Sequence, residues 1–191
     1  MTTKKISWKP GTMVYPAPAV LVTVGASRQD WNMFTVAWTG TVCTDPPMLY
    51  ISVRPSRFSY PALIKEMEFT LNLTTDEMAR STDWAGVRSG KDFDKWKETG
   101  LTPIDGEKVA SPTILESPLS IECRVREVVS LGTHDMFIAD VLNLRADQRW
   151  IDPQTGAFSL KNAGLLVYVH GGYYSLGDFI GKFGFSVKKS K

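Results

Sequence analysis

The short segment after Val53 gathers side chains that can bind an anion. Arg54, Ser56, Arg57 and Ser59 fall within one turn, and a helix is predicted to begin directly after them. The free amides and the positive dipole end of a helix N-terminus favour an anion, and an arginine can hold two phosphate oxygens at once. Taken alone, such a loop is more often solvated surface, so the case for a phosphate site depends on the strands before it.

Small side chains flank Trp38 in the run 33–42 that precedes this loop. Thr35, Ala37 and Thr39 alternate around the tryptophan, which leaves room for a ring system to approach the backbone. A flat aromatic ligand with polar edges would find donors and acceptors in the main chain at a strand edge, and a tryptophan to stack on it or gate it. The alternative is that Trp38 belongs to the hydrophobic core.

Two other segments carry groups that can approach such a ligand. The sequence SGKDFDK at 89–95 reads as a capped, exposed amphipathic helix, and the alternative is that one of its two lysines contacts a phosphate. His134 and His170 are the only histidines, and each by itself is more often structural than catalytic.

The sequence does not contain the motifs that several other classes of protein require. A serine hydrolase needs a GxSxG elbow, and nucleotide-binding folds need a Walker loop or GxGxxG, none of which occurs. The two histidines and two cysteines are too scattered for a metal site, and no histidine lies near Cys43 to activate it. A net charge of +2 without a basic stripe does not favour nucleic-acid binding.

The bulk properties favour a soluble, cytoplasmic protein. Apolar residues make up 43% and charged residues 22% of the 191 residues, which is typical of one globular domain. Cys43 and Cys123 form no CxxC or disulfide pattern, so reduced thiols in a cytoplasm are expected. No apolar run approaches the roughly 20 residues of a membrane span.

The elements that must position these groups are mostly strands. Period and composition predict strands at 20–25, 33–42, 48–53, 69–73, 120–129, 136–144 and 165–169, with 69–73 half-buried. Helices are predicted at 60–66, 75–85 and 93–100, with Ser59 and Asp92 or Asp94 as candidate caps. The proline-rich segment 102–118 is expected to be irregular.

Short connections make most neighbouring strands antiparallel. This pattern predicts a mainly β fold with inserted helices, in a closed or partly closed barrel. The sequence shows no repeat, linker or change of composition, so we expect a single domain over residues 1–191.

A series of segments along the chain resembles one known family. They are, in order, KPGTMVYPAPAVLVTVG, NMFTVAWTGTVCTDPPM, ISVRPSRFSY, SGKDFDKW, SPLSIECRV, GTHDMFIADV and GKFGFSVKK. This series resembles the flavin reductase-like family, the FMN-binding split barrels that include flavoredoxin. The resemblance implies a Greek-key split β-barrel, FMN bound non-covalently, and a homodimer with FMN at or near the subunit interface. Aromatic residues late in the chain, Tyr173, Tyr174, Phe179, Phe183 and Phe185, are expected to pack across that interface.

The resemblance also implies which residues border the cofactor. In this family a segment similar to SGKDFDK borders the cofactor, so Lys95 is the expected contact and Lys91 the reserve. His134 would contact the cofactor, and His170 is a weaker candidate. Asn32, through its side-chain amide, would reach the ring edge or the ribityl chain. The residues expected to bind FMN are Asn32, Thr35, Val36, Ala37, Trp38, Thr39, Ser52, Arg54, Ser56, Arg57, Phe58, Ser59, Lys95 and His134. No catalytic residue and no metal ligand is expected, because the chemistry belongs to the flavin. FAD is expected to bind less well than FMN, because a phosphate-sized site leaves its terminal group unrecognised.

Two functions fit this resemblance. The first is an oxidoreductase that takes hydride from NADH or NADPH and passes it through bound FMN to free flavin or to a redox protein. The second is an electron carrier of the flavoredoxin type, which exchanges electrons with other proteins and does not oxidise NAD(P)H directly. An FMN-binding sensor or storage protein is a third class that the sequence leaves open.

Overall fold

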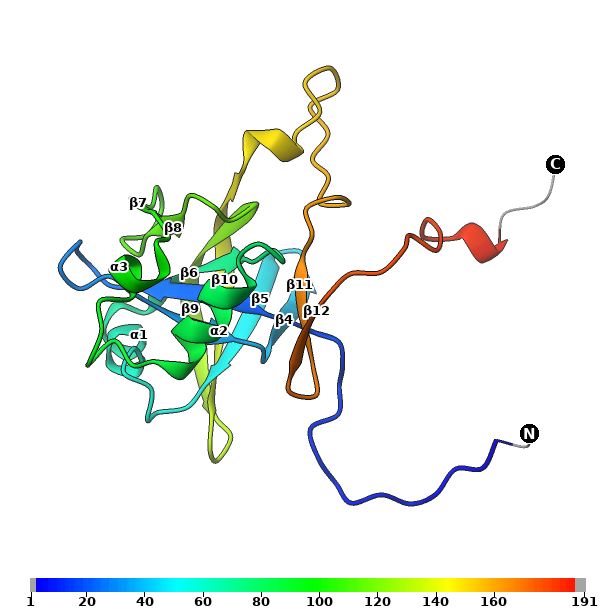
Figure 1. Cartoon of the computed structure of the whole chain (residues 1–191). Helices are drawn as coiled ribbons and strands as arrows, with labels where there is room; N and C mark the ends of the chain where they lie inside the picture. The colour runs from blue at the N-terminus through cyan, green and yellow to red at the C-terminus, as the bar shows by residue number, and fades with distance from the viewer. Residues whose placement is uncertain (1–2, 188–191) are drawn as a thin grey trace.

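The body of the molecule is one antiparallel sheet of seven strands, shown in Figure 1. The structure, a computed structural model, describes residues 3–187, so the closing lysines of GKFGFSVKK lie outside the described residues. The strand order is β3–β2–β6–β9–β10–β5–β4. The strands are β2 (Val20–Val24), β3 (Asn32–Val36), β4 (Thr39–Thr44), β5 (Pro47–Val53), β6 (Glu68–Leu73), β9 (Leu119–Ser130) and β10 (Asp135–Ala146).

The two edges of this sheet are consecutive strands. β3 ends at Val36 and β4 begins at Thr39, so only Ala37 and Trp38 separate them. The Ser52 amide on β5 donates a hydrogen bond of 2.8 Å to the Trp38 carbonyl. A sheet whose first and last strands are joined by two residues must curl back on itself, as strands in a barrel do. The expected mainly β architecture with inserted helices is confirmed, but the single strand predicted at 33–42 breaks into two at this corner.

A continuous hydrophobic core fills the inside of the curled sheet. On β5, Leu49, Ile51 and Val53 are buried and alternate with more exposed neighbours. Phe69 and Phe137 lie fully buried in the same cluster. Burying a side chain of this size stabilises a fold by roughly 1.5–3 kcal/mol. The core therefore holds β5 and β10 rigidly where β5 leads into the loop that carries Arg54 and Arg57.

The strand β6 is buried on both faces, whereas the sequence predicted a half-buried strand. Thr70 and Asn72, which alternate with the core residues, are also fully buried. The Asn72 side-chain amide donates to the Leu21 carbonyl at 3.1 Å, and its oxygen accepts from the Ile114 amide at 3.0 Å. The segment 102–118 thus covers the outer face of β6, and hydrogen bonds satisfy its polar side chains. This segment also contains a short ladder, β7 (Pro103–Ile104) with β8 (Thr113–Ile114), where no regular structure was expected.

Three short helices lie against the sheet. α1 (Tyr60–Glu66) matches the predicted span. α2 (Ala79–Val87) begins and ends later than predicted, and α3 (Lys95–Thr99) lies within the span predicted for it. The Asp94 carboxylate accepts from two amides of α3 and Gly100 ends the helix at φ 69°, so both predicted signals are confirmed. Ser59 precedes α1, but its hydroxyl does not cap the helix.

A second, smaller sheet lies beside the barrel. β1 (Ala17–Pro18) pairs with β11 (Leu166–Val169), which forms a hairpin with β12 (Gly172–Ser175). The N-terminal arm and the C-terminal tail, which ends in the short helix η2 (Phe185–Val187), both project on the side of this hairpin (Figure 1). A further segment, which connects β10 to β11 and begins with the short helix η1 (Gln148–Trp150), projects from the end of β10 (Figure 1). No helix in residues 3–187 is long and apolar enough to cross a membrane.

Candidate functional site

A cavity of about 660 Å³ opens where the barrel turns its corner. Its walls come from β3, the link to β4, the end of β5, the following loop, α2 and the β11–β12 hairpin. The lining residues are Ala19, Phe34, Thr35, Val36, Ala37, Trp38, Ser52, Val53, Arg54, Ser56, Arg57, Asp83, Gly86, Val87, His134, Tyr168 and Tyr173. We call this the ring cavity, because its size and its mixed aromatic and polar walls suit a flat heteroaromatic ligand.

Backbone hydrogen bonds shape the wall of the ring cavity at the corner. The Thr39 amide donates to the Ala37 carbonyl at 3.1 Å, while the Ser52 amide holds the Trp38 carbonyl. These bonds fix the corner so that Ala37 and Trp38 face the cavity. Thr35 is anchored to α2, because its hydroxyl donates a hydrogen bond to the Thr82 carbonyl of that helix.

A second, smaller cavity of about 110 Å³ adjoins the ring cavity. Phe34, Ser56, Arg57 and Val87 line both of them. The smaller cavity is lined in addition by Asn32, Phe58, Ser59, Arg88, Ser89, Gly90 and Lys95. Three cationic side chains and several hydroxyls around a space of this size suit a phosphate group. We call it the phosphate cavity.

Lys95 is the most unusual residue of the phosphate cavity. Its side chain is buried, with only 4% of the residue exposed, and its ammonium donates one hydrogen bond of 2.6 Å to the Ala85 carbonyl. Burial, and then the positive charge of Arg57, lower the pKa of Lys95 to about 8. Among residues 3–187 no carboxylate pairs with it. A buried ammonium with donors to spare is the arrangement that an anionic group would complete.

Arg57 is held in place by the end of α2. Its guanidinium donates to the Gly86 carbonyl at 2.8 Å. Gly86 itself lies tight against β3, because a Cβ built there would come within 3.0 Å of the Thr35 Cβ. The helix end therefore fixes one arginine nitrogen and leaves the other donors of the guanidinium available.

Asn32 and Ser59 form the floor of the phosphate cavity. The Asn32 side-chain amide donates to the Ser59 hydroxyl at 2.7 Å. Ser59 itself has helical backbone angles, unlike a capping residue, which accounts for the absence of a side-chain cap on α1. Gly90 lies so close that a Cβ would be 2.6 Å from the Asn32 side-chain oxygen. Asn32 lines the phosphate cavity and not the ring cavity, and its expected contact with the ring edge or the ribityl chain stays a prediction.

Polar and charged groups stand at one end of the ring cavity. His134 receives or donates a hydrogen bond of 3.0 Å with the Thr133 hydroxyl. Burial, and then the charges of Arg54 and Arg57, lower the pKa of His134, so the imidazole is neutral at pH 7. Arg54 and Arg57 give this end of the cavity a positive potential.

Aromatic rings form the opposite wall. Tyr168 and Tyr173 of the hairpin pack together with ring centroids 5.8 Å apart. The Tyr15 ring lies beside both Trp38 and Tyr168, with ring centroids 6.3 and 6.1 Å away, respectively. Burial, and then the charge of Asp83, raise the pKa of Tyr173 to about 12, so its hydroxyl stays protonated. This wall offers ring faces with tyrosine hydroxyls at their edges.

The structure brings the predicted site residues together, with one exception. Except for Thr39, every residue expected to bind the cofactor lines the ring cavity or the phosphate cavity. Thr39 is buried at the corner, and its hydroxyl donates to the Tyr50 carbonyl at 2.5 Å. His170, the weaker candidate, lies exposed at the hairpin turn and lines neither cavity.

Sequence reasoning missed the residues that α2 and the hairpin contribute. Asp83, Gly86 and Arg88 on and after α2, and Tyr168 and Tyr173 on the hairpin, line the cavities but were not predicted to do so. The paired tyrosines around the His170-Gly171 turn were a usable signal, since aromatic side chains in a Gly-rich hairpin seldom serve the turn itself. Nothing in the helix sequence marked which of its faces would meet β3.

Comparison with known proteins gives one matching family. A family model described as the flavin reductase like domain matches residues 12–177. Among solved structures, flavoredoxin of Desulfovibrio vulgaris (Miyazaki F) is 28% identical and superimposes with a TM-score of 0.87, covering 97% of this chain and 100% of that one.

Two curated relatives add to this comparison. An uncharacterized protein of Archaeoglobus fulgidus is 30% identical over 132 residues, which cover 69% of this chain and 73% of that protein. The FMN reductase (NADH) RutF of Pantoea ananatis is 25% identical over 116 residues, which cover 60% of this chain and 58% of that protein.

Proposed function

The chain belongs to the flavin reductase-like family, and on that premise we propose that it is an FMN-binding oxidoreductase that accepts hydride from NADH or NADPH. Bound FMN would supply the two-electron chemistry, and the protein would supply binding, orientation and electrostatics. The acceptor would be free flavin or a redox protein. Two relatives support this activity, since they are named FMN reductase (NADH) and NADH:riboflavin 5'-phosphate oxidoreductase.

The single observation that carries the proposal is the buried Lys95 ammonium beside Arg57 in a phosphate-sized cavity. A phosphate placed there would receive charge-assisted hydrogen bonds from both groups, with Ser59 as a further partner. The adjoining ring cavity then lies where the rest of an FMN molecule must extend. Residues and cavities therefore fit the cofactor that the family implies.

The residues of the ring cavity have three tasks in this proposal. The small side chains of Thr35 and Ala37 leave room for the ring system against the barrel corner. Arg54 keeps a positive potential that favours negative charge on a reduced ring, and the neutral His134 can offer a ring N–H donor. The aromatic wall of Tyr168 and Tyr173 excludes water from one side of the slot.

An electron carrier without NAD(P)H oxidation is the second candidate. The similarity to a flavoredoxin over 97% of this chain favours it. A carrier and a reductase need the same FMN site, so they differ only in whether a nicotinamide can reach the ring. No dinucleotide fingerprint is required for that approach, because a nicotinamide can stack directly on an exposed flavin face.

One experiment separates the two functions. The purified protein is reconstituted with FMN, separated from free flavin, and mixed with NADH or NADPH in the absence of oxygen. Rapid bleaching of the visible flavin absorbance supports the reductase, whereas bound FMN that is inert to both donors supports the carrier. If FMN produces neither quenched fluorescence nor a thermal shift, the proposal as a whole is wrong.

A homodimer in the cytoplasm completes the proposal. Large apolar side chains are exposed on the C-terminal tail, including Phe179, Ile180 and Phe183, and on the N-terminal arm, including Trp8. Both segments project beside the hairpin that walls the ring cavity (Figure 1), so a second subunit that covers them would also cover the cofactor. Cys43 and Cys123 are both free thiols, which fits a reducing compartment.

A further inference from the structure

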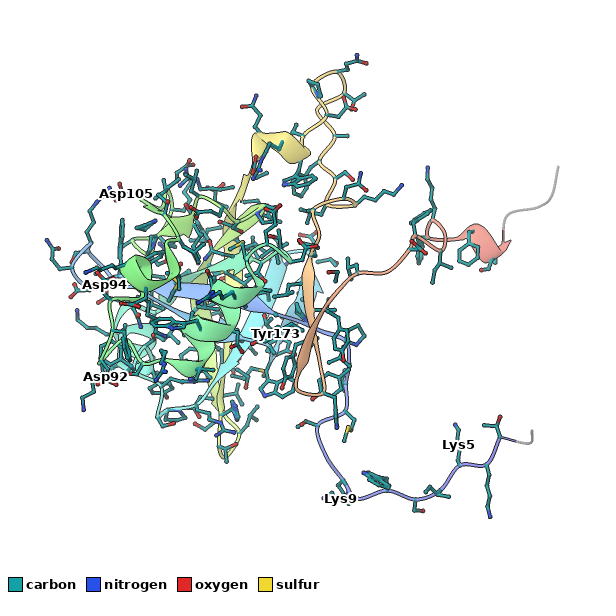
Figure 2. All side chains as sticks on the ribbon, viewed as in Figure 1. Lys5, Lys9, Asp92, Asp94, Asp105 and Tyr173 are labelled. Carbon is teal, nitrogen blue, oxygen red and sulfur yellow. The ribbon has the colours of Figure 1, made fainter. Side chains whose placement is uncertain are left out.

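The loop 54–59 connects the two halves of the candidate flavin site, since its residue Arg57 lines both the ring cavity and the phosphate cavity. The two cavities extend towards different sides of the body. Tyr173 belongs to the ring cavity, whereas Asp94 directly precedes Lys95 of the phosphate cavity, and Tyr173 and Asp94 lie on opposite sides in Figure 2. The position of this one loop therefore decides whether both cavities can hold a single ligand.

The loop has few contacts of its own that could fix its position. Residues 54–58 are exposed. Its backbone is bonded locally, from the Arg57 amide to the Arg54 carbonyl at 3.0 Å and from the Tyr60 amide to the Arg57 carbonyl at 2.9 Å. An exposed segment that is bonded mainly to itself is readily displaced. The attachment of its two ends therefore determines where the arginine side chains stand.

Both ends of the loop meet at Asp135, the first residue of β10. Val53, the last residue of β5, is paired with Asp135 in the antiparallel ladder. Tyr60, the first residue of α1, donates a hydrogen bond from its hydroxyl to the Asp135 carboxylate. One residue thus lies against the residue directly before the loop and against the residue directly after it.

Asp135 interrupts a row of apolar side chains. It is 7% exposed and continues the buried row of Phe137 and Ala139 on the same strand. The Tyr60 ring packs edge-on against Phe137, with ring centroids 5.7 Å apart. A buried carboxylate costs stability unless hydrogen bonds partner it. Hydrogen bonds from Tyr60 and then from Ser130 lower the pKa of Asp135, so the carboxylate is ionised at pH 7. Packing alone therefore does not account for an acidic residue at this position.

The pair of Tyr60 and Asp135 acts on the site from outside it. Neither residue lines the ring cavity or the phosphate cavity. His134, which directly precedes Asp135, lines the ring cavity together with Arg54 and Arg57. A fixed Asp135 therefore orders the loop and the histidine at the same time.

We propose that Asp135 is a positioning residue for the flavin, which acts through Tyr60 to fix the loop 54–59 where Arg57 can bind the phosphate. This inference rests on the proposed FMN-binding function and deepens it. Without the hydrogen bond, the loop keeps its sequence and its charge, but the guanidinium spends less time in the position that binds phosphate. The affinity for the phosphate group then falls, and the affinity for the ring system does not.

Titration of the full-length protein with FMN and with riboflavin tests the proposal. Tyr60→Phe removes the hydroxyl and leaves the ring that packs on Phe137. It is expected to weaken the binding of FMN about tenfold and that of riboflavin by less than about twofold. Asp135→Ala should have the same selective effect. Asp135→Asn keeps an oxygen that can accept from Tyr60, so it should restore most of the FMN affinity that Asp135→Ala loses.

Combined variants show whether the pair acts through the loop. In the Arg57→Ala protein the phosphate contact is already lost, so the addition of Tyr60→Phe is expected to weaken FMN by less than about twofold more. Tyr60→Phe added to Asp135→Ala should also have less than about a twofold effect, because the hydrogen bond is already absent. Losses that add in full in either combination overturn the assignment.

Tyr50→Phe is the matched control. Tyr50 is half-buried on β5, the strand that leads into the loop, and it lines neither cavity. Loss of its hydroxyl is expected to change the affinity for neither flavin. If Tyr60→Phe lowers the thermal unfolding midpoint but leaves the ratio of FMN to riboflavin affinity unchanged, the pair only supports the fold and the positioning role is wrong. If the unmodified protein binds neither flavin, the proposed function is wrong instead.

Discussion

Lys95 determines much of what the site can do at the scale of single residues. A lysine with its ammonium in a protein interior costs stability unless the charge is partnered. Here the ammonium has one carbonyl as a partner, and burial, followed by the positive charge of Arg57, lowers its pKa to about 8. A phosphate dianion would stabilise the charged form, so phosphate binding and protonation of Lys95 favour each other.

This linkage predicts a pH dependence of FMN affinity. Without ligand, Lys95 loses its proton as the pH rises through about 8, whereas bound phosphate raises its pKa. FMN binding therefore takes up a proton above pH 8, and the affinity for FMN is expected to fall between pH 7 and pH 9.5. The affinity for riboflavin, which lacks the phosphate, is expected not to fall over this pH range. Titration of both flavins across this range is the measurement, and Lys95→Met is expected to remove the difference. An equal change of affinity with pH for FMN and riboflavin would contradict this account.

Arg57 allows a second prediction at this scale. Arg57→Ala is expected to weaken FMN far more than riboflavin, because only FMN carries the phosphate that the guanidinium would hold. A hydrogen bond to a charged group contributes about 1.5–3 kcal/mol, so a loss of roughly tenfold to a hundredfold is expected. Gly86, whose carbonyl Arg57 now contacts, is half-buried and is followed by the exposed Val87 and Arg88, so this carbonyl can bond to water instead. Arg57→Lys keeps the positive charge but loses the paired donors of the guanidinium, so its affinity for FMN should lie between those of the unmodified protein and Arg57→Ala. Equal losses for both flavins would mean that Arg57 supports the fold or the ring cavity.

At the scale of elements, the contact of α2 with β3 sets the width of the ring cavity. Gly86 lies close to β3, since a Cβ built there would be 3.0 Å from the Thr35 Cβ. Thr35 is also bonded through its hydroxyl to the Thr82 carbonyl of the same helix. A larger side chain at position 86 would therefore displace a residue of the cavity wall.

Gly86→Val is expected to weaken FMN and riboflavin by a similar factor, in contrast to Arg57→Ala. A Cβ at position 86 would already lie 3.0 Å from the Thr35 Cβ, so the methyl groups of valine push helix and strand apart. Overpacking of this kind costs about 1–3 kcal/mol of stability. Thermal unfolding and flavin titration measure the two effects. Gly177→Val is the matched control, because a Cβ at Gly177 has no neighbour within 4 Å. Unchanged affinity for both flavins, with a clear loss of stability, would show that α2 does not control the cavity.

The elements also show how far the sequence determined the site. The strand, turn and loop from Asn32 to Ser59 were predictable, because period, prolines and arginines all fall in one continuous segment. The break at Ala37 and Trp38 was not, since the alternation runs through it and only the curl of the sheet requires a corner. Lys95 was selected by its resemblance to a family pattern, yet its own sequence reads as an exposed helix. Its burial follows from α2 packing above it, which no local signal encodes.

At the scale of the whole molecule, the two terminal segments are the least explained part of a monomer. The tail after β12 and the arm before β1 leave the barrel on the same side (Figure 1), and both expose large apolar side chains. Exposed apolar surface concentrated in two segments on one side of a molecule is typical of an interface. The tail sequence itself carried this signal, since its aromatic residues are numerous for a free end.

A triple variant, Phe179→Ser, Ile180→Ser and Phe183→Ser, is expected to shift the proposed homodimer towards monomer. These side chains are exposed on the single chain, so their replacement should leave the barrel intact while removing apolar area from the interface. Light scattering over a range of protein concentrations measures the shift, and the far-ultraviolet circular dichroism should not change. Leu115→Ser with Phe158→Ser, also exposed but outside the terminal segments, is the control and should remain dimeric. If the second subunit covers the ring cavity, the triple variant should also bind FMN more weakly, and dilution of the unmodified protein should weaken FMN binding in the same way. A wild-type protein that is monomeric and still binds FMN tightly would contradict both the dimer and its role in closing the site.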